Sequence, residues 1–329
     1  MLGSHVTADG KLHFAFHFFN TNQVLVAGNF SNWNPIPLEE TADGWWTVTV
    51  EPEGEGPVFY KFVANGEWHL DQFNIRKTMD GENSFLFVGG LCGHLLRRTF
   101  FSHALGREKA YTAYLPPSYS VEPTKHYPSL VLLPGLLDDE MTWPRKTDLE
   151  DVMDRLIGEE AIPEMIVIMP DKDDTMFHEE AWGAYGAYLD SDLRNHAEQE
   201  YRVKASGDCR AMEGLSLGGA WALRLASWHP DHYISVSGLS CAFSEDVVEA
   251  LRTSAPQLRE RQVRFRLACG DEEGPELFSA TWGFGQFLRD MGLSCETRMD
   301  HGPHDWPLWR TQLPHSLAFH GWTFLSKMK

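Results

Sequence analysis

The chain has 329 residues, of which 43% are hydrophobic and 23% are charged, so it is long enough for two globular domains with buried cores. The formal net charge of −19 argues against nucleic acid and anionic membranes as partners, because both need a basic surface. The five cysteines are widely spaced and form no Cys-x-x-Cys pair, so neither a metal site nor a disulfide framework is predicted.

The sequence carries no signal for a membrane or for export. No basic segment precedes an apolar run of signal-peptide length, and no apolar run is long enough to span a bilayer. We therefore expect a cytoplasmic protein, although a mature secreted form that has lost its leader would show the same pattern. The sequence does not fix an oligomeric state, so a homo-oligomer stays open.

Residues 1–90 predict a small all-β domain. They contain short runs in which apolar and polar residues alternate, and turn residues separate these runs. Several short strands at this spacing favour a sandwich of two sheets. The predicted strands are residues 12–18, 24–28, 45–50, 58–63 and 85–88.

Motifs of this first domain resemble a known family of modules. They are Gly-Asn-Phe-Ser-Asn-Trp at residues 28–33, Gly-Trp-Trp at 44–46, the run from Tyr60 to Trp68, and Asn-Ser at 83–84. Together they are similar to the early-set immunoglobulin-like domains of carbohydrate-binding module family 48. The resemblance covers nearly all of residues 1–90 and implies an immunoglobulin-like β-sandwich.

Four residues of the first domain match the sugar-binding positions of that family. In its glucan-binding members two tryptophans stack on sugar rings while a lysine and an asparagine bind hydroxyl groups, and the matching residues are Trp33, Trp68, Lys61 and Asn83. Flat aromatic rings suit the C–H faces of sugars, and hydroxyl groups need directed polar partners. Related modules bind no sugar and only flank a catalytic domain. The resemblance therefore implies either carbohydrate binding or a docking role.

The pattern changes after residue 90, where Gly-Gly-Leu-Cys-Gly at residues 89–93 predicts a linker. We therefore expect one domain at residues 1–90 and a second at residues 91–329. The second opens with two predicted antiparallel strands, and strands and helices then alternate, which favours a mainly parallel α/β sheet with helices on both faces. The predicted strands are 95–102, 109–115, 130–133, 163–170, 209–213, 234–237 and 263–269, and the predicted helices are 148–158 and 220–226.

The segment Gly214-Leu215-Ser216-Leu217-Gly218 has the Gly-x-Ser-x-Gly form of a nucleophile elbow. An apolar run of strand length precedes it and a helix-forming run follows it, which is the context that the motif requires. A serine at such a tight strand-to-helix turn exposes its hydroxyl, and the flanking glycines let strand and helix approach closely. Ser216 is therefore the candidate nucleophile.

Several motifs of the second domain together resemble one hydrolase family. They are Leu-Pro-Pro-Ser-Tyr at residues 115–119, Tyr-Pro at 127–128, Gly-Leu-Ser-Leu-Gly-Gly at 214–219 and His-Asp-Trp-Pro-Leu-Trp at 304–309. They are similar to the esterase D family, which includes feruloyl and acetylxylan esterases of carbohydrate esterase family 1, S-formylglutathione hydrolases and enterochelin esterases. The resemblance runs from about residue 93 to the end. It implies an α/β-hydrolase fold and a serine carboxylesterase that needs no cofactor and no metal.

The nucleophile requires a base, which is the last member of the triad along the chain in this fold. We expect His304 to be this base, because it matches the family's histidine before Asp-Trp. The rival histidines are His301, three residues away, and His315 and His320, which fall on a predicted terminal helix.

The orienting acid is expected on the loop after the strand at residues 263–269, where the sequence reads Gly-Asp-Glu-Glu. The spacing favours Glu273, with Asp271 as the runner-up. The pattern leaves the choice among Asp271, Glu272 and Glu273 open.

Two backbone N–H groups are expected to form the oxyanion hole: that of Leu217, directly after the serine, and that of Leu136, after the strand at residues 130–133. Family members often carry His-Gly-Gly where this chain reads Pro-Gly-Leu at residues 134–136, and a backbone donor tolerates that change. Trp143 and Trp182 are candidates for the walls of the substrate pocket, and as large aromatic residues they fit a core role equally well.

These observations predict a serine carboxylesterase that acts on a small-molecule or carbohydrate ester, and the module-like first domain favours feruloyl or acetyl esters of carbohydrates. A siderophore lactone is the first alternative, because enterochelin esterases also join a β-domain to this hydrolase fold. Their Arg-x-x-Glu-Leu-type segment is not evident at residues 188–193, which read Tyr-Leu-Asp-Ser-Asp-Leu. The second alternative is a carbohydrate- or partner-binding protein with a weakly active hydrolase body.

Overall fold

In a computed structural model that describes residues 3–7, 9–41, 44–74, 78, 81–89 and 92–327, the chain divides into two compact units. The first unit contains residues 1–98 and 113–123, and the second contains residues 99–112 and 124–329. The domain boundary expected between residues 90 and 91, inside the predicted linker, lies outside the described residues and stays a prediction.

The first unit is all-β, as its alternating pattern predicts. One antiparallel sheet has the order β1-β2-β6-β5, and the other has the order β4-β3-β7-β8, with β9 also paired to β7. The five predicted strands correspond to β2, β3, β6, β7 and β9. The strands are β1 (His5–Val6), β2 (Leu12–His17), β3 (Val24–Gly28), β4 (Ile36–Pro37), β5 (Glu39–Glu40), β6 (Trp45–Val50), β7 (Gly56–Ala64), β8 (Glu67–His69) and β9 (Ser84–Val88).

The core of the first unit is largely aromatic. Phe14 and Phe16 on β2 and Tyr60 and Phe62 on β7 are at most 3% exposed, and on β7 the buried residues alternate with more exposed ones. Phe16 stacks on Phe62 with ring centroids 4.4 Å apart, which joins the two sheets. The period-of-two pattern in the sequence therefore marks the inner faces of the sandwich.

Most of an eight-stranded sheet of order β10-β11-β13-β12-β14-β15-β16-β17 belongs to the second unit, and the strands that follow β11 in this order are parallel. All the predicted strands are present. β17 was not predicted, because it is a polar, partly exposed strand at the sheet edge and lacks an apolar run. The strands are β10 (His94–Ser102), β11 (Arg107–Leu115), β12 (Ser129–Leu133), β13 (Ile166–Pro170), β14 (Arg210–Leu215), β15 (Ser235–Leu239), β16 (Arg264–Gly270) and β17 (Ser294–Asp300).

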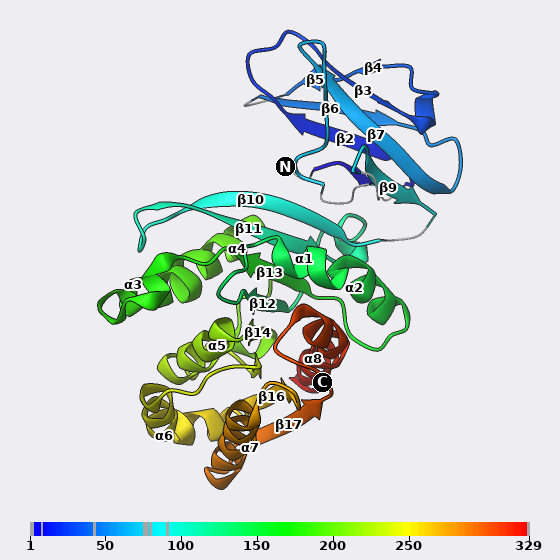
Figure 1. The fold of residues 1–329 in the computed structure, drawn as a ribbon. Coiled ribbons are helices and arrows are strands. Elements are labelled where there is room, and N and C mark those ends of the chain that lie inside the picture. Colours follow the sequence, from blue (N-terminus) through cyan, green and yellow to red (C-terminus); the bar gives the residue numbers. More distant parts are fainter. Residues whose placement is uncertain are drawn as a thin grey trace. The chain divides into compact units, whose positions relative to one another are not determined.

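Helices cover both faces of this sheet. In Figure 1, α2 and α8 lie on one side of it and α5, α6 and α7 on the other. The α-helices are α1 (Thr142–Thr147), α2 (Leu149–Gly158), α3 (Trp182–Ala187), α4 (Arg194–Glu200), α5 (Leu217–Trp228), α6 (Glu245–Glu260), α7 (Pro275–Asp290) and α8 (Trp306–Lys327), and a π-helical segment (Tyr188–Leu193) links α3 to α4. Because both faces are covered, every residue of β12, β13, β14 and β15 is buried.

A buried polar cluster joins the central strands to α8. Glu213 on β14 accepts a hydrogen bond from Ser316 Oγ at 2.9 Å, and its other oxygen lies 3.2 Å from His320 Nε2. The second ring nitrogen of His320 lies 2.7 Å from Ser235 Oγ on β15. All four residues are fully buried, so each contact fixes the position of α8 on the sheet. Burial lowers the pKa of His320 below its usual value of 6.5, against the opposing effect of Glu213.

The low pKa of His320 predicts a loss of stability in acid. Below about pH 6.5 the unfolded chain binds a proton at His320, whereas the folded protein keeps this residue neutral. The contribution of His320 to the free energy of unfolding is therefore fully present above that pH. It is lost as the pH falls, at up to about 1.4 kcal/mol per pH unit. We expect the His320→Gln variant to lose less free energy of unfolding than the wild type between about pH 7.5 and about pH 5, as measured by urea denaturation. His126 is exposed, so the His126→Gln variant should show the wild-type dependence of the free energy of unfolding on pH. The same pH dependence in all three proteins would contradict the prediction.

Candidate active site

Ser216 lies at the sharp turn between β14 and α5, as the elbow motif predicts. Its backbone adopts φ 52° and ψ −112°, a left-handed conformation that costs a non-glycine residue on the order of 1–3 kcal/mol. The backbone N–H of Ser216 donates to the carbonyl of Leu239 at 2.7 Å, which ties the turn to the end of β15. The side chain is partly exposed, so its hydroxyl is available for chemistry.

The glycines of the motif allow a close approach that no other residue would permit. A Cβ atom on Gly214 would lie 2.1 Å from the backbone of Gly218. A Cβ atom on Gly218 would lie 2.5 Å from the carbonyl oxygen of Pro134, on the loop after β12. The elbow and that loop are therefore packed backbone to backbone.

His304 is the histidine that the fold brings to Ser216. Its Nε2 lies 3.2 Å from Ser216 Oγ, and the edge of its ring meets Trp309 with centroids 4.9 Å apart. The predicted rivals have other surroundings: His301 is beside Asp271, while His315 and His320 lie on α8. His304 is thus placed to accept a proton from the serine.

Glu273 is the carboxylate that the fold brings to His304. Its Oε1 lies 3.4 Å from His304 Nδ1 and accepts a hydrogen bond from Ser240 Oγ at 2.5 Å, and its side chain is fully buried. Asp271 and Glu272 instead face His301, at 3.2 Å and 3.7 Å. The hydrogen bond from the backbone N–H of Gly302 lowers the pKa of Asp271, and the contact with His301 lowers it further. Hydroxyl, imidazole and carboxylate therefore follow one another in the order that nucleophilic catalysis needs.

The loop after β12, which carries Leu136, is held by a buried aspartate. Asp138 Oδ2 accepts the backbone N–H of Gly135 at 3.0 Å, and Lys172 Nζ donates to the Asp138 carbonyl at 2.7 Å. Burial raises the pKa of Asp138. Leu136 is 52% exposed on this loop, and Leu217 is the first residue of α5. The sequence analysis identified neither Asp138 nor Lys172. The available signal for Asp138 was an aspartate three residues after a turn glycine.

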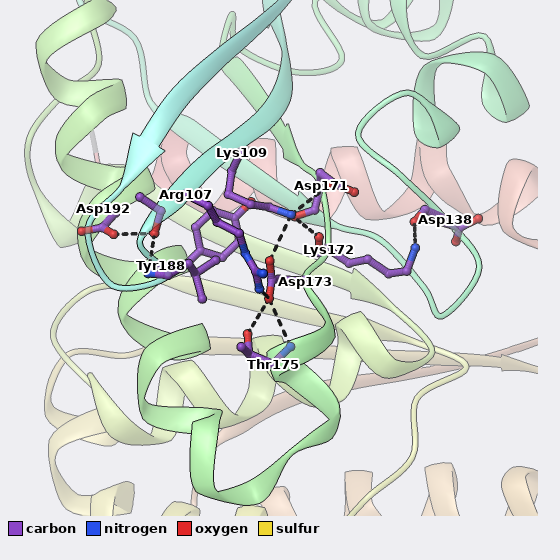
Figure 2. A network of polar contacts seen from close by, with 11 residues as sticks. Arg107, Lys109, Asp138, Asp171, Lys172, Asp173, Thr175, Tyr188 and Asp192 are labelled. Atoms are coloured by element: carbon purple, nitrogen blue, oxygen red, sulfur yellow. Dashed lines mark hydrogen bonds and ion pairs between the residues drawn. The ribbon is translucent and has the colours of Figure 1, made fainter.

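A network of ion pairs fixes Lys172 at the end of β13 (Figure 2). Lys109 Nζ donates to Asp171 Oδ2 at 2.8 Å and to the Lys172 carbonyl at 2.5 Å, and Tyr188 donates to the Asp171 carbonyl at 2.7 Å. Asp173, which is 5% exposed, pairs with Arg107 and accepts the N–H of Thr175. The segment from which Lys172 reaches Asp138 is therefore held on several sides, as buried charges require.

The two tryptophans proposed as pocket walls have different environments. Trp143 is fully buried, donates to the Leu133 carbonyl at 3.2 Å and packs edge-on against Trp306, so it occupies the core role of the two that were considered. Trp182 is partly exposed, donates to the Met176 carbonyl at 3.0 Å and stacks under the guanidinium of Arg224 at 4.1 Å.

The residues that match a sugar-binding site form part of the surface of the first unit. Trp33 is 41% exposed and Trp68 is 53% exposed, and their ring centroids are 6.3 Å apart at an interplanar angle of 62°. Trp33 has a φ of 60° in a turn after β3, and Trp68 pairs with Val63 across the β7–β8 hairpin. Lys61 pairs with Glu82 at 3.4 Å, and the backbone N–H of Asn83 donates to Thr78.

Two groups of described residues have ligand-type atoms close enough for a metal ion: Asp190 with His229 and His232, and Asp271 with Glu272 and His301. The buried Asp190 already accepts a hydrogen bond from Tyr233 at 2.7 Å and contacts His232 Nδ1 at 2.9 Å. The second group is exposed. Within the described part of the chain, no helix has the length and apolar character to cross a membrane.

Comparisons with known proteins find esterases. A family model described as "Putative esterase" matches residues 102–320, more than half of the chain. The endo-1,4-beta-xylanase/feruloyl esterase of Xylanibacter ruminicola is 23% identical over 338 residues, which cover 93% of this chain and 44% of that relative. The chain thus spans less than half the length of this curated relative.

Solved structures give the same fold. A ferulic acid esterase superposes with a TM-score of 0.65 at 26% identity, covering 71% of this chain and 100% of that chain. Ferric enterobactin esterase from Salmonella typhimurium superposes with a TM-score of 0.57 at 16% identity, covering 96% of this chain and 95% of that chain. At 16% identity the second likeness concerns the fold alone.

The positions of the acidic residues predict different effects for two conservative variants. In Glu273→Gln a neutral amide replaces the carboxylate that meets both Ser240 and His304. We therefore expect kcat for an aryl ester to fall by roughly 100-fold or more. Asp271→Asn changes the contacts of Asp271 with His301 and with the backbone N–H of Gly302 and leaves Glu273 in place, so it should alter kcat by less than about threefold. Steady-state kinetics on the two purified variants measures both effects, and a larger loss in Asp271→Asn would reverse the assignment.

Proposed function

The chain belongs to the esterase family whose model matches residues 102–320, and from this premise we propose that it is a serine carboxylesterase with Ser216, His304 and Glu273 as its catalytic triad. The observation that carries the proposal is the distance of 3.2 Å between His304 Nε2 and Ser216 Oγ, across 88 residues of sequence. The left-handed backbone at Ser216 and the burial of Glu273 support it further.

In this mechanism the hydroxyl of Ser216 attacks the ester carbonyl while His304 Nε2 takes its proton. Glu273 accepts from His304 Nδ1, which holds the ring in the tautomer that leaves Nε2 free as a base. His304 then gives the proton to the departing alcohol oxygen. Water, deprotonated by the same nitrogen, attacks the acyl-enzyme; the bond from the acyl carbon to Ser216 Oγ then breaks, His304 returns the proton to that oxygen, and the acid is released.

The charge that develops on the carbonyl oxygen is stabilised by the backbone N–H groups of Leu217 and Leu136. Leu217 begins α5, so the positive end of that helix dipole lies at the serine. The bond from Gly135 to Asp138 and the contact of Lys172 with the same loop support a fixed position for the second donor.

As substrates we propose acyl esters of carbohydrates, of the feruloyl or acetyl type. The relative named endo-1,4-beta-xylanase/feruloyl esterase aligns with 93% of this chain, and a ferulic acid esterase has the same fold at 26% identity. The pair of exposed tryptophans on the first unit is consistent with a carbohydrate as the alcohol part.

A siderophore lactone is the second candidate substrate. It is favoured by one observation, the coverage of 96% of this chain by ferric enterobactin esterase, which takes in both units. Both candidates use the same chemistry and differ in the alcohol and acyl parts. A hydrolysis panel of feruloyl and acetyl sugar esters against a catechol trilactone separates them, because only one class should reach a high kcat/KM.

We expect Ser216→Ala to abolish the reaction while the protein keeps its fold. Removing the nucleophile should lower kcat for feruloyl and aryl esters by roughly 1,000-fold or more and should end covalent labelling by a fluorophosphonate, with an unchanged circular dichroism spectrum. His304→Gln should behave likewise, whereas the neighbouring and 80% exposed His301→Gln should not. Undiminished turnover in Ser216→Ala would refute the assignment.

For the first unit we propose carbohydrate binding through Trp33 and Trp68. Each stacked ring contributes on the order of 1 kcal/mol or more, so Trp68→Ala should weaken binding to a soluble glucan or xylan by roughly tenfold in isothermal titration calorimetry. The matched control is Trp282→Ala on α7, which removes a ring of similar exposure, 54% against 53%. Equal affinity in Trp68→Ala and wild type, or no measurable binding by the wild type, would leave the first unit with the docking role.

A further inference from the structure

Ser240 has an unusual backbone for a buried serine. It directly follows β15, is 1% exposed and has a φ of 50°, in the left-handed region that favours glycine. Its N–H donates to the carbonyl of Ala268 on β16 at 2.6 Å, so the neighbouring strand holds the residue in place. Strain of this kind costs stability and persists only where the surroundings impose it. A glycine would adopt the same conformation without strain, so the side chain has a role that offsets this cost.

The hydroxyl of Ser240 links two residues of the site. Trp309 Nε1 lies 2.8 Å from Ser240 Oγ, and Ser240 Oγ lies 2.5 Å from Glu273 Oε1. An indole N–H can only donate and an ionised carboxylate can only accept. The hydroxyl oxygen therefore accepts from Trp309, and its single proton is directed to Glu273.

Glu273 depends on this contact for its orientation. Its Oε1 faces both Ser240 and His304, whereas Oε2 is buried and has no hydrogen-bond partner among the described residues. The terminal bond of a glutamate rotates easily, so a carboxylate with partners at only one oxygen is oriented by the contacts of that oxygen alone. Removing the Ser240 donor would therefore release the oxygen that meets the imidazole.

Trp309 ties the same contact to the base. Its ring meets His304 edge-on with centroids 4.9 Å apart at 90°, while its N–H is bound to Ser240. Trp309 is 6% exposed on the first turns of α8. One rigid side chain thus contacts the histidine and the residue that holds the acid.

We propose that Ser240 is a positioning residue of the esterase reaction, which is held by Trp309 and fixes Glu273 Oε1 at His304 Nδ1. The inference rests on the proposed triad and adds to it a residue from a fourth segment of the chain, the loop after β15. Ser240 touches neither the substrate nor the serine in this role. Its effect on the reaction passes entirely through Glu273.

A double-mutant cycle tests this dependence. Ser240→Ala should lower kcat for an aryl ester by roughly 10- to 100-fold with KM changed by less than about threefold, because the substrate contacts stay intact. In a Glu273→Gln background the same change should lower kcat by less than about threefold, since the carboxylate that it positions is already lost. A comparable loss in both backgrounds would overturn the proposal, and so would a wild-type kcat in Ser240→Ala.

Two further variants separate positioning from folding. Ser240→Gly removes the hydroxyl and relieves the backbone strain, so it should unfold at a higher urea concentration than Ser240→Ala while losing kcat to the same extent. Ser237→Ala is the matched control: Ser237 is a buried serine on β15 whose hydroxyl has no hydrogen-bond partner among the described residues, and its variant should keep wild-type kcat. A loss of kcat that follows stability across the three variants would also refute the proposal.

Trp309→Phe tests the other end of the link. It keeps an aromatic ring against His304 but removes the N–H, so kcat should fall in the same direction as in Ser240→Ala and the two effects should not add. Additive losses would contradict a shared link. If Glu273→Gln itself keeps wild-type kcat, the triad assignment fails; if it loses activity while Ser240→Ala does not, only the positioning role fails.

Discussion

The close approach of β14 and α5 is the constraint on which the active site depends. The backbones of Gly214 and Gly218 are so near that a Cβ atom on the first would lie 2.1 Å from the second. Strand and helix cannot meet in this way unless the residue between them adopts a left-handed conformation, and that residue is Ser216. The strain is maintained because β14 is buried between β12 and β15, whose Leu239 carbonyl accepts the N–H of the serine.

The parallel sheet explains why residues so distant in sequence can act together. Parallel strands all end at the same edge, so the loops after β12, β14, β15, β16 and β17 lie along one edge of the second unit. These loops carry Asp138, Ser216, Ser240, Glu273 and His304. Buried hydrogen bonds then fix individual side chains, because in a low dielectric an unpaired polar group is costly and a paired one is rigid. The proposed chemistry therefore relies on the sheet for proximity and on these contacts for orientation.

Most of the fold could be predicted from the sequence because the signals for it are local. Alternation in the first ninety residues marks strands with one buried face, and continuous apolar runs such as residues 130–133 mark strands buried on both faces. β17 was not predicted because its sequence carries no such local signal. It lies at the sheet edge, is partly exposed and carries polar residues, so its strand character comes from pairing with β16.

By itself the sequence determined the elbow and the identity of its serine, since spacing and glycine content are properties of a short segment. The spacing only favoured Glu273 among Asp271, Glu272 and Glu273, and the tertiary structure alone shows which of them lies beside His304, because it buries the side chain of Glu273 there and leaves the other two at His301. The same holds for Trp143 and Ser240. Their burial and their hydrogen-bond partners depend on residues from distant segments, which no local pattern encodes.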